Sequence, residues 1–141
     1  MNQATRTGFT VLRFCLPFLV VVFIRSYPGP WNLTRWIGLV IAVFSSVLLL
    51  VAHLQLGGSF SVTPQARHLV TGGLYSKFRN PIYIFGGLLI FGLILPLNRP
   101  SLWIIFMIAI PIQIARAHKE ANVLEEKFGD EYREYCKKTW F

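Results

Sequence analysis

Apolar residues run in four long segments along the chain, at residues 9–24, 33–54, 82–97 and 101–115. A membrane-crossing helix needs about 17–25 mostly apolar residues, and the second segment meets that length most clearly. The first segment contains Arg13 and Pro17, so its uncharged run is short for a span. A bilayer admits only structures that satisfy their backbone hydrogen bonds internally. The pattern therefore predicts an all-α, polytopic membrane helix bundle with about four transmembrane helices.

The third and fourth segments are joined by the short sequence PLNRP, and Pro81 stands directly before the third. Proline suits the first turn of a helix because its missing N–H would be unpaired there in any case. We therefore expect two antiparallel helices within residues 81–116 that form a transmembrane hairpin.

The C-terminal tail has a different pattern. Its apolar and aromatic residues recur at intervals of three and four, at Ala121, Leu124, Phe128, Tyr132 and Tyr135. This spacing predicts an amphipathic helix within residues 117–141, which Gly129 interrupts or kinks. The opposite face is net acidic, whereas a helix that lies on a membrane usually has a basic polar face. We therefore expect the tail to dock on the protein's own basic loop, residues 55–80.

Charge and composition agree with a membrane protein. The 141 residues are 54% hydrophobic and only 14% charged, against about 25% charged in soluble domains. All six acids follow residue 119, and the Lys and Arg residues before it lie at the ends of apolar segments. Lipid headgroups explain such cations, so no nucleic-acid partner is expected. The positive-inside rule favours both termini and residues 55–80 in the cytoplasm, as in a protein of a cytoplasmic (inner) membrane.

Metal chemistry is not expected from this sequence. Cys15 and Cys136 are far apart, and His53, His68 and His118 are too dispersed to form a metal-binding motif. Polar residues instead gather on the cytoplasmic face, where Arg116 and Glu120 are four apart and share one helix face. The alternative interpretation is an interfacial belt of cations with one such helix pair.

Two motifs carry a resemblance to a known family. HLVTGGLYSKFRNPIY, followed by an apolar hairpin and then by RAHKEANVLEEKFGDEYREYCKK, is similar to the isoprenylcysteine carboxyl methyltransferase and phospholipid methyltransferase family of integral membrane enzymes. The similarity covers about residues 67–136. It implies a methyltransferase that uses S-adenosylmethionine and acts on a lipophilic acceptor entering from the bilayer. The chain would then be one membrane domain: two spans in 1–54, a cofactor loop in 55–80, the hairpin in 81–116, and a helix in 117–141 that completes the site.

The resemblance also implies roles for single residues. Cofactor binding would fall to His68, Leu69, Val70, Tyr75, Asn80, Pro81, Ile82, Tyr83 and Glu120. Arg116 and Glu120 would be the catalytic residues, with Arg116 orienting the acceptor. The sequence departs from the family pattern at Asn80, where His is usual, at Leu74 in place of Pro, and at Ala121 in place of a second acid. Asn80 can form hydrogen bonds but cannot titrate.

Other functions remain open at this point. Membrane reductases of the steroid-reductase type have a similar C-terminal architecture and bind NADPH, and the cations Arg67, Lys77, Arg79 and Lys119 would suit its phosphates. The elements RNPIY and FGDEY favour the methyltransferase. A third possibility is a non-catalytic membrane protein of the same fold. The acceptor itself is not readable from the sequence: a prenylcysteine-like carboxylate, a phospholipid amine and a small amine or thiol all fit.

Overall fold

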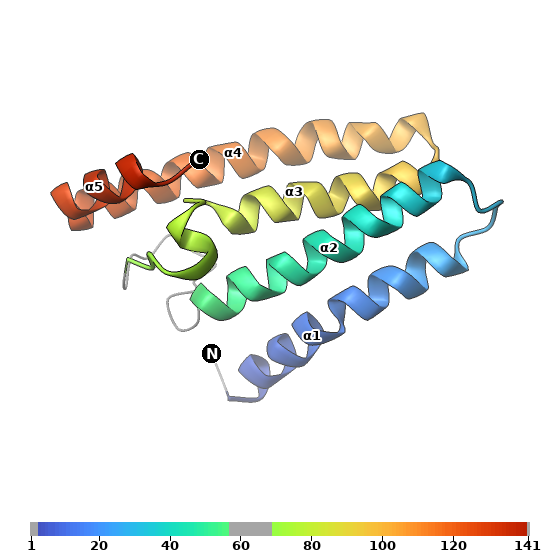
Figure 1. Ribbon diagram of the computed structural model, residues 1–141, viewed down its shortest axis with the longest axis horizontal. Helices are drawn as coiled ribbons and strands as arrows, with labels where there is room; N and C mark the ends of the chain where they lie inside the picture. The colour runs from blue at the N-terminus through green and yellow to red at the C-terminus, as the bar shows by residue number, and fades with distance from the viewer. Residues whose placement is uncertain (1–2, 57–68, 141) are drawn as a thin grey trace.

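Four long helices lie side by side in the computed structural model, which describes residues 3–56 and 69–140 (Figure 1). The helices are α1 (Gln3–Ser26), α2 (Leu33–Leu56), α3 (Pro81–Ile94), α4 (Trp103–Phe128) and the short α5 (Asp130–Lys138). Single 3-10 turns, η2 (Gly73–Ser76), η3 (Leu95–Leu97) and η4 (Pro100–Leu102), occupy the connections. No strand occurs within the two described ranges, which confirms the all-α class.

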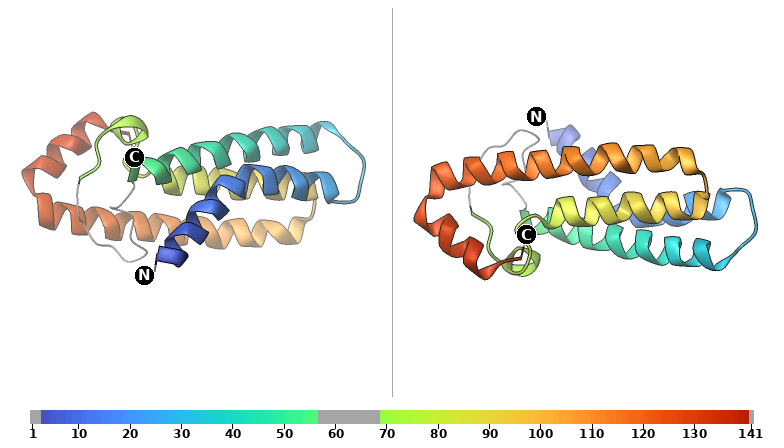
Figure 2. Two further views of the ribbon diagram at one scale, coloured as in Figure 1. Left: turned by 90° about the horizontal axis from the view of Figure 1, so that it is seen from below. Right: turned by 90° about the horizontal axis from the view of Figure 1, so that it is seen from above.

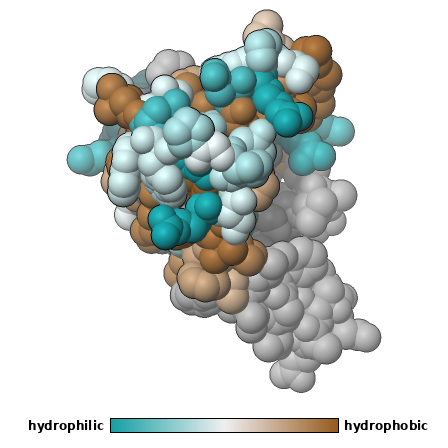
Figure 3. Space-filling view, turned by 90° about the vertical axis from the view of Figure 1, so that its right-hand side faces the viewer, coloured by the Kyte–Doolittle hydropathy of each residue, from teal (hydrophilic) through white to brown (hydrophobic). Residues whose placement is uncertain are grey.

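The surface of the bundle is that of a membrane protein. Leu33–Leu56 and Pro100–Phe128 are long and apolar enough to cross a bilayer, and Cys15–Ser26 and Pro81–Leu97 are shorter apolar helices. Large apolar side chains such as Phe44 on α2 and Met107 on α4 are more than half exposed, as expected where lipid replaces water. At the end of the bundle that holds the two short connections, hydrophilic patches lie among apolar ones (Figure 3).

Arg35 joins α1 to α2 at that end. Its side chain is only 3% exposed, and its guanidinium donates hydrogen bonds to the carbonyls of Gly29 (2.7 Å), Ile24 (2.5 Å) and Tyr27. The last carbonyls of a helix have no partner within the helix. One buried arginine therefore supplies donors for the end of α1 and the loop that follows.

The contact between α2 and α3 depends on small residues. A Cβ atom added at Gly92 would lie 2.6 Å from the backbone nitrogen of Ala42, and one added at Gly38 would lie 2.9 Å from the carbonyl oxygen of Gly92. Real Cβ atoms do not approach backbone this closely. Small residues let two helix backbones approach in a membrane, and here they hold α2 against α3.

The hairpin of α3 and α4 follows the sequence prediction at its turn and departs from it at its end. Asn98 adopts a left-handed conformation (φ 47°) between the two 3-10 turns, and Pro81 opens α3. However, α4 does not stop near residue 115 but continues as one helix to Phe128, beyond the end of α3 (Figure 1). The break comes at Gly129 (φ 51°, ψ −118°), as its lack of a side chain predicts.

The tail docks on the segment before α3, as expected. From Gly129 the short helix α5 turns back towards residues 73–79 (Figure 2). The Tyr135 hydroxyl donates a buried hydrogen bond of 2.7 Å to the Tyr75 carbonyl. Beyond α5, the Trp140 N–H bonds to the Lys77 carbonyl (2.6 Å) and the Arg79 N–H to the Trp140 carbonyl (3.2 Å). The C-terminal residues and residues 75–79 therefore form one unit.

Candidate functional site

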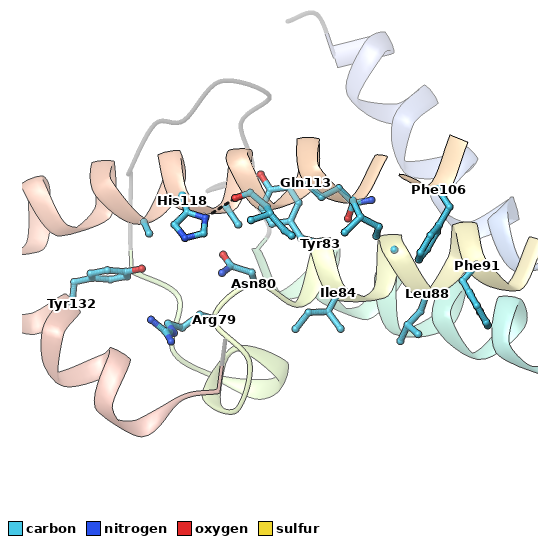
Figure 4. Close-up of a pocket in the computed structure, with 15 residues that line it drawn as sticks. Arg79, Asn80, Tyr83, Ile84, Leu88, Phe91, Phe106, Gln113, His118 and Tyr132 are labelled. Atoms are coloured by element: carbon cyan, nitrogen blue, oxygen red, sulfur yellow. Dashed lines mark hydrogen bonds between the residues drawn. The ribbon is translucent and has the colours of Figure 1, made fainter. Parts of the chain in front are cut away.

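A cavity of about 570 Å³ lies between α3 and α4 (Figure 4). Most of its wall is apolar, with side chains from both helices: Ile84, Leu88, Phe91, Phe106, Ile110 and Ile114. One end is polar and is formed by Arg79, Asn80, His118 and Tyr132. Its volume falls within the roughly 300–1,000 Å³ of small-molecule sites. The cavity is therefore suited to an amphiphilic molecule with an apolar body and a polar head.

The polar end follows from the local sequence around Pro81. Proline fixes the start of α3 and is itself buried, which places Asn80 at the N-cap position. The Asn80 side chain makes no capping hydrogen bond and lines the cavity instead. Arg79, one residue earlier, reaches the same end (Figure 4). The turn that starts α3 thus places an amide and a guanidinium at the head of an apolar cavity.

Gln113 places a polar group within the apolar wall. It is the sole amide in residues 101–115, and its Oε1 atom is buried without a hydrogen-bond partner among the described residues. Cβ atoms added at Gly86 and Gly87 would lie 3.6 and 3.8 Å from this oxygen. The two glycines of α3 thus leave room for the Gln113 amide. Since polar residues inside membrane helices are rare and often functional, this amide was a signal that the sequence analysis missed.

A second polar cluster adjoins the cavity on the charged C-terminal part of α4. The charged part of this helix begins at Arg116, beyond its apolar stretch. There Glu120 is half-buried and accepts a hydrogen bond from Tyr83, a residue that lines the cavity. Burial raises the pKa of the Glu120 carboxyl above its usual range. The Tyr75 hydroxyl is buried without a partner in the described parts of the chain, and burial, then the charge of Glu120, raise its pKa.

Four of the predicted site residues therefore come together. Asn80 and Tyr83 line the cavity, whereas Tyr75 and Glu120 lie next to it and are linked to it through Tyr83. Positions about 40 residues apart in the sequence thus form one cluster. Pro81 is fully buried and does not line this cavity, and it contributes by starting α3.

The remaining predicted residues lie elsewhere. Leu69, Val70 and Ile82 are half-buried outside the cavity wall. Arg116 is exposed and does not line the cavity, although its charge acts on Tyr83. His68 lies outside the described residues.

Two further lining residues were misjudged from the sequence. Tyr132 was expected only as part of the apolar face of the tail, yet it closes the polar end, where burial raises its pKa to about 12. The Nδ1 atom of His118 donates a 2.9 Å hydrogen bond to the Ile114 carbonyl. Because a carbonyl can only accept, Nδ1 carries the proton in the neutral ring, and Nε2 is the basic nitrogen.

The fold and cavity together define an all-α membrane bundle with an amphipathic internal site. A family model described as phospholipid methyltransferase matches residues 33–131, from the start of α2 into α5. This is well over half of the chain and includes both walls of the cavity. The chain belongs to the phospholipid methyltransferase family, a family of membrane methyltransferases. No curated protein matches the sequence.

Proposed function

We propose that the protein transfers a methyl group from S-adenosylmethionine to a lipophilic acceptor that reaches the site from the bilayer. The observation that carries this proposal is the cavity between α3 and α4, whose wall is apolar along most of its length and polar at one end. Leu88 and Ile114 line it and are 41% and 52% exposed. The cavity therefore borders the lipid-facing surface, through which an apolar molecule can pass without crossing water.

The cluster around Glu120 suits such a cofactor. S-adenosylmethionine supplies an electrophilic methyl group on a sulfonium centre, and its methionine part carries an ammonium group. Glu120 is a half-buried carboxylate, and it has no ion-pair partner among the described residues. Tyr75 offers a buried hydroxyl donor beside it, and Asn80 offers an amide that makes no capping hydrogen bond. A carboxylate kept from water gains most from a cationic ligand.

The residues around the cavity orient the acceptor and exclude water, which is most of what a methyl transfer requires. A carboxylate or thiolate acceptor is already a nucleophile. An amine acceptor must lose a proton, and the Nε2 atom of His118 is a base that can take it. The prenylcysteine-like carboxylate, the phospholipid amine and the small amine or thiol therefore each have a feasible route.

Calorimetric titration of the purified protein with S-adenosylhomocysteine and, separately, with NADPH tests the proposal. We expect S-adenosylhomocysteine to bind and NADPH not to bind; binding of NADPH alone would overturn the proposed activity in favour of a reductase.

Glu120→Gln should weaken S-adenosylhomocysteine binding at least about tenfold, the scale of one charge-assisted hydrogen bond. The matched control is Glu126→Gln, which removes an exposed carboxylate from the same helix. Equal affinities of the two variants would show that the site is misplaced.

Incubation with labelled S-adenosylmethionine and total membrane lipid, followed by chromatography, addresses the acceptor. We expect the label to appear in a lipid-soluble product. Label that stays in the aqueous phase would contradict a lipophilic acceptor.

A further inference from the structure

Arg79 is a cation at the polar end of the cavity, and none of the described residues forms an ion pair with it. Its side chain is half-buried and lines the cavity, and its Nε atom is buried without a hydrogen-bond partner among residues 3–56 and 69–140. Arg133 and Lys137 form ion pairs with acids on the surface of the tail, away from the cavity. A guanidinium taken out of water without a charged partner is costly unless a ligand completes it.

Two of the described groups near Arg79 are the phenols of tyrosines. Its charge acts on Tyr132 and Tyr135, both buried residues of α5. Asn80, beside it, adds a neutral amide, and the N-terminus of the 14-residue α3 adds the positive end of a helix dipole. Charge and dipole at this end of the cavity therefore both favour a negative group.

The cavity is long enough for the rest of such a molecule. Phe106 and Ala121 both line it, and 15 residues of helix separate them by about 22 Å. The wall at the far end from Arg79 consists of the aromatic rings of Phe91 and Phe106 (Figure 4). A single apolar chain fits along this wall while its head lies beside Arg79.

We propose that Arg79 binds the anionic group of the acceptor, a phosphate or a carboxylate, and thereby positions the acceptor's head at the polar end of the cavity. The inference rests on the proposed function and narrows its substrate to anionic amphiphiles. The Nε atom and one terminal nitrogen of a guanidinium form the fork that binds two oxygens of such a group. Arg116 was the expected residue for this task, but it is exposed and outside the cavity wall.

Replacing the Arg79 side chain leaves its structural role in place. The residue holds the tail through its backbone, since its N–H donates to the Trp140 carbonyl. Arg79→Gln can therefore test binding without removing that contact. Lys77→Gln is the matched control, because Lys77 is an exposed cation two residues away that does not line the cavity.

The experiment measures binding of four probes to the full chain in maltoside micelles: dodecyl phosphate, dodecanoate, dodecanol and inorganic phosphate. We expect at least one anionic amphiphile to bind at least about tenfold more tightly than dodecanol, and Arg79→Gln to remove that difference. The preference between phosphate and carboxylate identifies the headgroup. Lys77→Gln should leave all four affinities unchanged, and inorganic phosphate should bind weakly because it lacks the apolar chain.

Three results would overturn the assignment. The first is equal binding of the charged probes and dodecanol, and the second is an equal loss of binding in Lys77→Gln, which would indicate general surface charge. The third is a loss of S-adenosylhomocysteine affinity in Arg79→Gln, which would place the arginine on the cofactor's carboxylate. Because probe binding does not require methyl transfer, it can succeed even if the proposed activity fails, so the two failures are distinguishable.

Discussion

Gly92→Ala should destabilise the bundle, although alanine is the better helix former. The added Cβ would lie 2.6 Å from the nitrogen, 2.9 Å from the Cα and 3.0 Å from the Cβ of Ala42. All three atoms belong to the backbone or root of α2, so no side-chain rotation can relieve the contact. The two helices must separate by nearly 1 Å to reach an ordinary contact of 3.4 Å or more.

The size of the effect follows from two opposing contributions. Overpacking of a close interface costs about 1–3 kcal/mol, and the change from glycine to alanine in a helix recovers about 1 kcal/mol. We therefore expect a net loss of up to about 2 kcal/mol in the free energy of unfolding. Gly86→Ala on the same helix is the control, because its Cβ would meet only the Gln113 Oε1 atom at 3.6 Å. That variant should be neutral or up to about 1 kcal/mol more stable.

Thermal unfolding in maltoside micelles, followed by tryptophan fluorescence, measures both variants against the wild type. We expect Gly92→Ala to melt below the wild type and Gly86→Ala at or above it. If both variants melt at the same temperature, helix propensity decides the outcome, and the close contact between α2 and α3 does not exist as described.

Three further predictions concern the tail, the end of α1 and the site. Tyr135→Phe leaves the buried Tyr75 carbonyl without its donor at a cost of about 1–3 kcal/mol, so amide exchange at residues 75–79 should accelerate; unchanged exchange would contradict the docking. Arg35→Gln should lower the free energy of unfolding by about 3 kcal/mol, measured by denaturant titration, and a loss below 1 kcal/mol would refute its capping role. Because only the ionised Glu120 attracts an ammonium, S-adenosylhomocysteine affinity should fall as pH drops through its raised pKa; a flat calorimetric profile would exclude this ionic contact.

The arrangement of the helices was largely predictable from the sequence, because it depends on local patterns. Apolar runs, the PLNRP turn and the three-four spacing of the tail each act over a few residues, and each produces the expected element. The end of the fourth helix was not predictable in this way. Helix-forming residues continue without interruption from the apolar stretch into the tail, so α4 stops only at Gly129.

The cavity, unlike the helices, could not be predicted from local sequence patterns. Gln113 lines it because Gly86 and Gly87 face the same side of α3, which depends on how α3 and α4 are rotated against each other. Arg79 was visible as a cation near the membrane, but the burial of its Nε atom without a hydrogen-bond partner among the described residues is a property of the folded chain. The family motif led to Glu120, Tyr83 and Asn80, whereas Arg116, the residue it implied for the acceptor, lies outside the cavity wall.

The docking of the tail links the two halves of the site. The segment from Tyr75 to Arg79 supplies residues to both halves, Tyr75 beside Glu120 and Arg79 inside the cavity. Trp140 holds this segment through its own N–H and carbonyl. Because these contacts involve only backbone atoms, they depend little on which side chains the last residues carry. The tail can therefore differ from the family pattern and still fix the distance between the groups proposed to bind cofactor and acceptor.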